Sequence, residues 1–372
     1  MRRLPTIATL TALVAGITAA QPKDFNAYPE HITPYLQRMF SDGQGKFAWR
    51  DNYPGGVDAW RNETRAALSD RIGLGAIAAQ AGAFEPRVIL SPPDDMGGYT
   101  RQQGAIETEP SVTVAFWLLK PKGDGPYPLA LLPHGHDTAG HDTHIGLARS
   151  DGHRKKIEEE DRDVAVQAVE RGFLAIAPAT RGMAAGGVPD LHDRHGKRDC
   201  RAQQMHCLLA GRTAMGERVW DMMRLIDWAA ARDDVDASRI LVMGNSGGGM
   251  VTIYTAALDT RVTVAVPSCS FCALASPSGY IYHCDCNLVP GLLDFGDLAD
   301  IAGLTSPRAM LAVNGREDPL FDPKDVERAA GRTKAIYTAA GAPDRFDHQW
   351  GHAGHRFYSD LMWPFVMAHI GE

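Results

Sequence analysis

One short stretch, Ile240 to Gly249, constrains both the fold and the chemistry of this chain. Its first four residues are apolar and predict a buried strand, which runs directly into a Gly-x-Ser-x-Gly turn. The turn holds the hydroxyl of Ser246 clear of the backbone, and it requires small residues at Gly244 and Gly248 because the chain doubles back there. Residues 250–254 continue as a helix whose amino terminus favours negative charge. We therefore predict that Ser246 is a nucleophile rather than an idle serine in a glycine-rich turn.

Predicted strands and helices alternate along most of the chain. Runs of apolar or β-branched residues predict strands at 111–119, 127–132, 173–177, 262–266, 309–313 and 344–350. Apolar spacing predicts helices at 57–72, 158–172, 218–232, 325–340 and 359–370. The strand, helix and strand between residues 127 and 177 make a βαβ unit, which requires a parallel sheet. We expect an α/β fold with a mostly parallel central sheet and helices on both faces.

A serine nucleophile needs a base that takes its proton and an acid that orients the base. In hydrolases with this turn, the acid lies in a loop just after a strand downstream of the serine. Asp318 has that position, shortly after the predicted strand at 309–313. Glu317 and Asp322 are competing candidates, and an acid in a salt-bridged surface loop is the structural alternative.

The base is expected in a loop near the carboxyl terminus. His355 follows a flexible glycine and precedes the closing helix, so it is the favoured candidate. His352 is second, and His348 also qualifies by its order in the chain. A surface histidine without a catalytic role is the alternative for any of the three.

Two backbone N–H groups are predicted to stabilise the negative charge that develops on the attacked carbonyl oxygen. One belongs to Gly247, the residue after the nucleophile, and the other to His136. His136 lies in the His134-Gly135-His136 turn that ends the predicted strand at 127–132. The ring of His134 is expected to be structural in that turn.

The amino terminus predicts an export signal. Arg2-Arg3 supply positive charge, residues 4–17 are apolar, and 18–20 form a small-residue cleavage site. We expect residues 1–20 to be a signal peptide and 21–372 to form a single domain with a helical amino-terminal extension. The mature chain would then be periplasmic or extracellular, without a membrane anchor. A formal net charge of −7 gives no reason to expect nucleic-acid binding.

The six cysteines all lie in the middle of the chain, at 200, 207, 269, 272, 284 and 286. An even number in an exported protein predicts disulfides, although the sequence does not fix their pairing. The rival interpretation is a zinc site, because Cys269-x-x-Cys272 and Cys284-x-Cys286 have metal-like spacing. Residues 181–211, which hold two of the cysteines, show no periodicity and predict a long polar loop at the carboxyl edge of the sheet. This loop is either functional or a solvated segment held by one disulfide.

Several of these motifs together resemble a known family. They are Pro133-His134-Gly135-His136, Gly211-Arg212-Thr213 to Asp221, Asp236 to Ile240, the serine turn, Ser306-Pro307-Arg308 to Asp318, and Gly354-His355-Arg356-Phe357. From about Trp60 onward the chain resembles the bacterial α/β-hydrolases grouped with acetyl xylan esterases and dienelactone hydrolases. The resemblance implies an α/β-hydrolase fold and hydrolysis of small-molecule or carbohydrate esters through an acyl-enzyme, with no cofactor or metal. Secreted acetyl xylan esterases of this kind carry Gln after the serine, whereas this chain has Gly247.

Two other functions are alternatives to an esterase. The first is a peptidase of the same fold, although such peptidases often carry a large additional domain. The second is a metal-binding protein that retains the fold, which the paired cysteines and a run of histidines would support. The run consists of His134, His136, His141 and His144. The complete order of serine, acid and histidine favours the enzyme.

Overall fold

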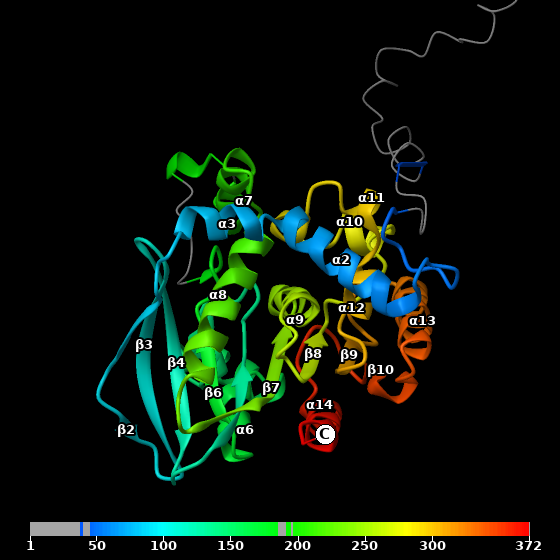
Figure 1. Ribbon diagram of the computed structural model, residues 1–372. Coiled ribbons are helices and arrows are strands. Elements are labelled where there is room, and N and C mark those ends of the chain that lie inside the picture. The colour runs from blue at the N-terminus through cyan, green and yellow to red at the C-terminus, as the bar shows by residue number, and fades with distance from the viewer. Residues whose placement is uncertain (1–37, 40–44, 185–190, 195, 372) are drawn as a thin grey trace, which may run out of the picture. The chain divides into compact units, whose positions relative to one another are not determined.

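The computed structural model describes residues 38–39, 45–184, 191–194 and 196–371 (Figure 1). The fold described below lies within residues 43–372, which form one compact unit. The predicted signal peptide and its cleavage site lie outside the described residues. Among the helices of the described part, none is long and apolar enough to cross a membrane.

A ten-stranded sheet forms the centre of the unit, with strand order β1-β3-β4-β6-β5-β7-β8-β9-β10 and β2 paired to β3. The strands are β1 (Arg87–Leu90), β2 (Asp94–Asp95), β3 (Tyr99–Glu109), β4 (Val112–Pro121), β5 (Tyr127–Leu131), β6 (Leu174–Pro178), β7 (Val235–Asn245), β8 (Val264–Ser268), β9 (Ala309–Gly315) and β10 (Phe346–Gly351). Strands β5 to β10 run parallel, whereas β1, β3 and β4 pair antiparallel at one edge. The predicted βαβ unit is confirmed, because β5 and β6 are parallel neighbours.

Helices cover both faces of the sheet (Figure 1). One face packs against α2 (Gly56–Ile72), α3 (Leu74–Ala81), α8 (Ala214–Ala230), α9 (Gly247–Leu258), α12 (Leu298–Gly303) and α13 (Pro323–Ala339). The other face packs against α6 (Val164–Glu170) and α14 (Ser359–His369). Each face of the sheet has its own hydrophobic core. Because successive side chains of a strand point to opposite faces, Leu129 and Leu131 of β5 belong to the first core and Ala130 to the second.

The predicted helix at 158–172 is wrong as a single element. Helix α5 (Asp151–Glu159) ends before α6 begins at Val164. Asp161 lies between them with a φ of 54°, a left-handed conformation that cannot continue a right-handed helix. The apolar spacing of α6 was visible in the sequence, but the break was not.

The predicted polar loop at 181–211 contains a helix, α7 (Asp199–Leu209). Its buried face carries both apolar and polar residues, namely Cys200, Ala202, Gln203, Gln204 and Cys207. This mixture removes the apolar periodicity by which a helix is predicted from sequence. Short helices also occur in the cysteine-rich connection after β8, where α10 (Pro277–Tyr280), η4 (Asp285–Asn287) and α11 (Leu292–Phe295) follow one another.

Candidate active site

The predicted turn around Ser246 connects β7 to α9. Ser246 itself has a φ of 58°, so the backbone is held in a conformation that side chains rarely adopt. A Cβ atom built on Gly248 would lie 2.1 Å from the carbonyl oxygen of Pro133, and one on Gly244 would lie 2.5 Å from the carbonyl of Gly248. The structure therefore gives the reason for small residues on both sides of the serine.

The turn after β5 packs directly against this serine turn. A Cβ atom on Gly135 would lie 3.1 Å from the Cβ of Ser246 and 3.0 Å from the backbone nitrogen of Gly247. The buried ring of His134 donates from Nδ1 to the carbonyl of Gly135 across 2.7 Å, and its Nε2 accepts from the backbone N–H of Thr180 at 2.9 Å. Burial lowers the pKa of His134 to about 3, so the ring stays neutral and holds the turn in place.

Asp318 and His355 form a hydrogen-bonded pair. His355 Nδ1 lies 2.6 Å from Asp318 Oδ2, and the backbone N–H of Leu320 donates to the other carboxylate oxygen at 3.1 Å. The side chain of Asp318 is fully buried, whereas that of His355 is 27% exposed. Of the competing acids, Glu317 is exposed and Asp322 caps the amino terminus of α13. A histidine that donates from Nδ1 to a carboxylate presents Nε2 as a proton acceptor.

The other two candidate histidines lie in different environments. His348 is on β10, with its Nε2 3.3 Å from Asn314 Oδ1, and burial lowers its pKa to about 4. His352 packs the edge of its ring against Tyr358, with ring centroids 5.8 Å apart. The structure therefore brings His355, and neither of its competitors, to Asp318.

The loop that carries His355 is fastened to the serine turn by hydrogen bonds of the neighbouring residues. The backbone carbonyl of Arg356 accepts from Asn245 Nδ2 at 3.0 Å and from the hydroxyl of Ser268 at 2.7 Å. The backbone N–H of Ser246 in turn donates to the carbonyl of Ser268 at 2.8 Å. These contacts connect the segment that follows His355 to the turn that contains Ser246. The role of Asn245 was not predicted from the sequence, in which only its position inside the turn could have indicated it.

Comparisons with known proteins agree with this geometry. A family model described as acetyl xylan esterase matches residues 169–274, which include the serine turn. YtaP of Bacillus subtilis, named as a hydrolase, is 27% identical over 244 residues, which is 65% of this chain and 77% of that protein. With the strand order and the turn between β7 and α9, these matches decide the fold. The chain has the α/β-hydrolase fold.

Solved structures of proteins described as carbohydrate esterases have a similar fold. A Bacteroides fragilis protein assigned as an acetyl xylan esterase superposes with a TM-score of 0.65 at 16% identity, over 90% of this chain and 83% of that one. A glucuronoyl esterase from Solibacter usitatus gives a TM-score of 0.61 at 14% identity, over 88% of this chain and 96% of that one. At these identities the superpositions show a shared fold.

A cavity of about 790 Å³ lies beside the turn that contains Ser246. Its lining comes from residues 136–138, 182–184, 197–201 and 280–285, together with Leu288. Ser246 and His355 are not among the lining residues. His136, which is, also lies next to the serine turn, because a Cβ atom on Gly247 would lie 3.3 Å from His136 Nδ1. Both cysteine-bearing segments therefore border this cavity.

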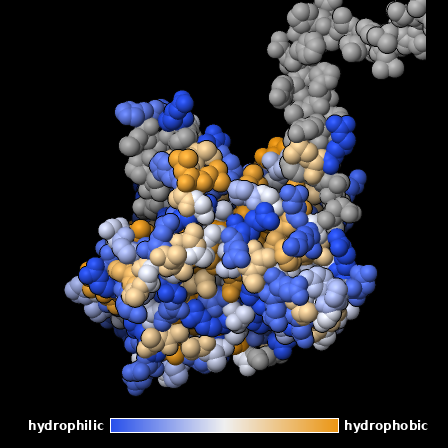
Figure 2. Space-filling view, turned by 45° about the horizontal axis from the view of Figure 1, so that its top comes forward, coloured by the Kyte–Doolittle hydropathy of each residue, from blue (hydrophilic) through white to orange (hydrophobic). Residues whose placement is uncertain are grey.

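In Figure 2, hydrophilic residues cover most of the face shown, with an orange area where α7 lies in Figure 1.

The six cysteines all carry free thiols in the structure, so the expected disulfides are not formed there. Cys269 is buried beside Asp318 and His355, and burial together with the charge of Asp318 raises the pKa of its thiol to about 12. Cys272 Sγ contacts His283 Nε2 at 3.5 Å in the interior. Since a protonated buried thiol is a poor nucleophile, Cys269 does not compete with Ser246 for that role.

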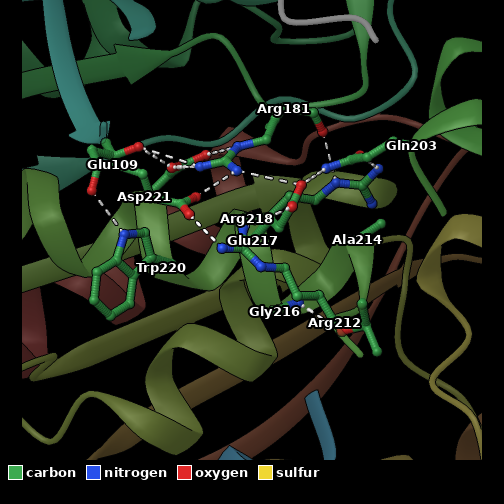
Figure 3. A network of polar contacts seen from close by, with 12 residues as sticks. Glu109, Arg181, Gln203, Arg212, Ala214, Gly216, Glu217, Arg218, Trp220 and Asp221 are labelled. Atoms are coloured by element: carbon green, nitrogen blue, oxygen red, sulfur yellow. Dashed lines mark hydrogen bonds and ion pairs between the residues drawn. The ribbon is translucent and has the colours of Figure 1, made fainter. Parts of the chain in front are cut away.

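Buried ion pairs hold the elements behind the cavity together, a feature that the sequence analysis missed (Figure 3). The guanidinium of Arg181, just after β6, pairs with Asp221 of α8, with Glu109 of β3 at 2.9 Å and with Glu217 at 3.3 Å. Arg212 adds a contact to Glu109 at 2.8 Å. The network thus joins β3, α8 and the segment that follows β6 and leads into the cavity.

Proposed function

We propose that this protein is a serine esterase that hydrolyses carboxylic esters, with acylated or uronate-esterified carbohydrates as its preferred substrates. The observation that carries the proposal is the 2.6 Å hydrogen bond between His355 and Asp318, in a loop that Asn245 fastens to the turn of Ser246. This arrangement would orient His355 as the base for the hydroxyl of Ser246, a half-buried residue.

In the first half of the reaction, Ser246 Oγ attacks the ester carbonyl while His355 Nε2 takes its proton. Asp318 accepts the hydrogen bond from Nδ1 and stabilises the imidazolium that forms. The backbone N–H groups of Gly247 and His136 are the proposed donors to the oxyanion, and each such donor contributes about 3 kcal/mol in the transition state. His355 then gives the proton to the leaving alcohol, and an acyl-enzyme remains.

In the second half, water attacks the acyl-enzyme and His355 takes a proton from it. Collapse of the tetrahedral intermediate releases the carboxylic acid and returns the proton to Ser246. The carbohydrate preference rests on the similarity to acetyl xylan and glucuronoyl esterases and on the open cavity beside the site. Export of the chain, which the amino-terminal sequence predicts, would give it access to polysaccharides.

Purified protein comprising residues 21–372 tests the proposal against acetyl, feruloyl, methyl-uronate and aryl esters. We expect release of acid from at least one carbohydrate ester, and loss of that activity in a Ser246→Ala variant prepared in parallel. Absence of ester hydrolysis, or equal rates for the variant, would refute the serine esterase. Hydrolysis of a peptide panel in place of the esters would favour the peptidase alternative.

A further inference from the structure

Four potential metal ligands from three separate segments converge at the edge of the cavity. They are His136 after β5, Cys200 in the first turn of α7, and Cys284 and Cys286 in and beside η4. One side-chain ligand atom from each residue lies within 4.8 Å of those of the other three. Cys200 and Cys286 are buried, whereas His136 is exposed and Cys284 is half-buried. The cluster is therefore built into the protein and still accessible from one side.

The shorter distances in this cluster match the edges of a tetrahedron around a metal ion. Cys200 Sγ lies 3.7 Å from Cys284 Sγ, and Cys286 Sγ lies 3.5 Å from His136 Nε2. With bonds of about 2.3 Å to sulfur and about 2.0 Å to nitrogen, tetrahedral Zn²⁺ separates two of its ligands by about 3.5 to 3.8 Å. A single disulfide would use two of the three thiols and leave the third next to the imidazole.

A buried guanidinium supplies positive charge next to the cluster. Arg218 is fully buried, and its Nη1 lies 3.3 Å from the Sγ of Cys286. Its other contacts are oxygens of uncharged groups, including the carbonyl of Arg181 at 2.9 Å and Gln203 Oε1 at 3.1 Å (Figure 3). Within the described part of the chain, no carboxylate lies at ion-pair distance from Arg218. A buried cation needs an anion, and a thiolate at Cys286 would supply one.

We propose that His136, Cys200, Cys284 and Cys286 bind one Zn²⁺ ion in a closed, tetrahedral site. Three thiolates and one neutral imidazole leave the complex with one net negative charge, which the guanidinium of Arg218 compensates. Binding releases to solvent the protons that the thiols carry. A closed set of four protein ligands leaves no position for substrate, so the ion is structural and takes no part in ester cleavage.

The position of the site explains what it would stabilise. The ion would fasten α7 and the connection after β8 to the turn that contains His136. That turn packs against Ser246, and the Nδ1 side of the His136 ring faces Gly247. Because the ring would be ligated through Nε2, the ion would also fix the backbone of His136 next to the proposed oxyanion site. The inference does not depend on the proposed function, since metal content is measured without a substrate.

The test uses residues 21–372, reduced, incubated with Zn²⁺ alone and freed of excess metal by gel filtration. Elemental analysis should find about one zinc per chain in the wild type and nearly none in Cys286→Ser. Cys207→Ser is the matched control, because Cys207 is buried on the same helix as Cys200 but lies outside the cluster; it should retain the zinc. Replacement of zinc by Co²⁺ should produce thiolate-to-cobalt charge-transfer absorption in the wild type and the control.

His136→Ala is a second variant that lacks one ligand, needed in case Cys286→Ser does not fold. It is expected to fold because His136 is exposed and the backbone N–H is kept. It should lose zinc while its circular dichroism spectrum stays that of the wild type. The proposal is wrong if reduced wild-type protein retains no zinc, or if zinc stays bound in both Cys286→Ser and His136→Ala. It is also wrong if mass spectrometry of the native protein finds Cys200 and Cys284 joined by a disulfide.

Discussion

Asn245 donates a hydrogen bond from its side-chain amide to the backbone carbonyl of Arg356 across 3.0 Å, although the two residues are 111 positions apart. Asn245 precedes the proposed nucleophile, Ser246, and Arg356 follows the proposed base, His355. The bond therefore connects the two loops whose separation decides whether proton transfer is feasible. Catalysis depends on such placement, because a displacement of about 1 Å can cost 100-fold in rate.

Replacement of Ser246 by alanine should abolish ester hydrolysis and leave the fold intact. The nucleophile is lost, so kcat should fall by at least about 10³-fold. The backbone strain at a φ of 58° is the same for serine and alanine, so the free energy of unfolding should change by less than about 1 kcal/mol. Steady-state kinetics and thermal melting check both parts. A variant that keeps most of its activity would show that another residue is the nucleophile.

His355→Ala and His352→Ala form a matched pair that tests the assignment of the base. Loss of His355 should lower kcat by at least about 10³-fold, because it removes the group that accepts the proton of the serine. Loss of His352, whose ring packs against Tyr358, should change kcat by less than about threefold. The same ester is used for both variants. The reverse order of effects would assign the base to His352.

Arg181→Met should destabilise the protein strongly. The guanidinium of Arg181 contacts Asp221 and Glu109. Without it, Glu109 keeps its contact with Arg212, whereas the buried carboxylate of Asp221 loses its ion-pair partner and keeps only the hydroxyl of Thr108. Breaking a buried ion pair in this way costs about 3 to 5 kcal/mol of folding free energy. Lys155→Ala, which removes an exposed pair with Glu159, should cost less than about 1 kcal/mol. Urea unfolding measures both, and equal costs would show that the network contributes little to stability.

The buried histidines should make the protein sensitive to mild acid. Burial lowers the pKa of His144 to about 4, whereas the unfolded chain has a histidine pKa of about 6.5. The stabilisation is therefore complete above pH 6.5 and is lost as the pH falls toward 4, because the unfolded chain takes up a proton that the folded one does not. The loss is at most about 1.4 kcal/mol per pH unit for this group.

His144→Gln isolates this effect, because its amide can still donate to the carbonyl of Leu132, which the ring of His144 contacts at 3.0 Å. The free energy of unfolding is measured at pH 8 and at pH 5. Its decrease between the two pH values should be smaller for the variant than for the wild type. At pH 8 the imidazole is neutral in both the folded and the unfolded chain, so that measurement gives the cost of the substitution itself. An equal decline in both proteins would mean that His144 does not carry the acid sensitivity.

The sequence by itself determined the features that depend on local patterns. The strand, turn and helix around Ser246 were predictable because their apolar residues and glycines are contiguous. Asp318 and His355 could be proposed because the order of acid and base along the chain follows from the fold. The sequence favoured His355 but did not settle the choice among three nearby histidines, because that choice depends on distances between side chains.

Tertiary structure alone decided the contacts between distant segments. His136 and Cys286 are 150 positions apart. The paired cysteines and the run of histidines suggested metal binding as an alternative, but the sequence did not show which of these residues meet. Helix α7 was hidden because its buried face is lined by glutamines and cysteines, which carry no apolar period. Local periodicity reports only whether a residue faces the interior. Which groups meet there is set by long-range packing, and this is why the four ligands of the candidate metal site emerged only from the fold.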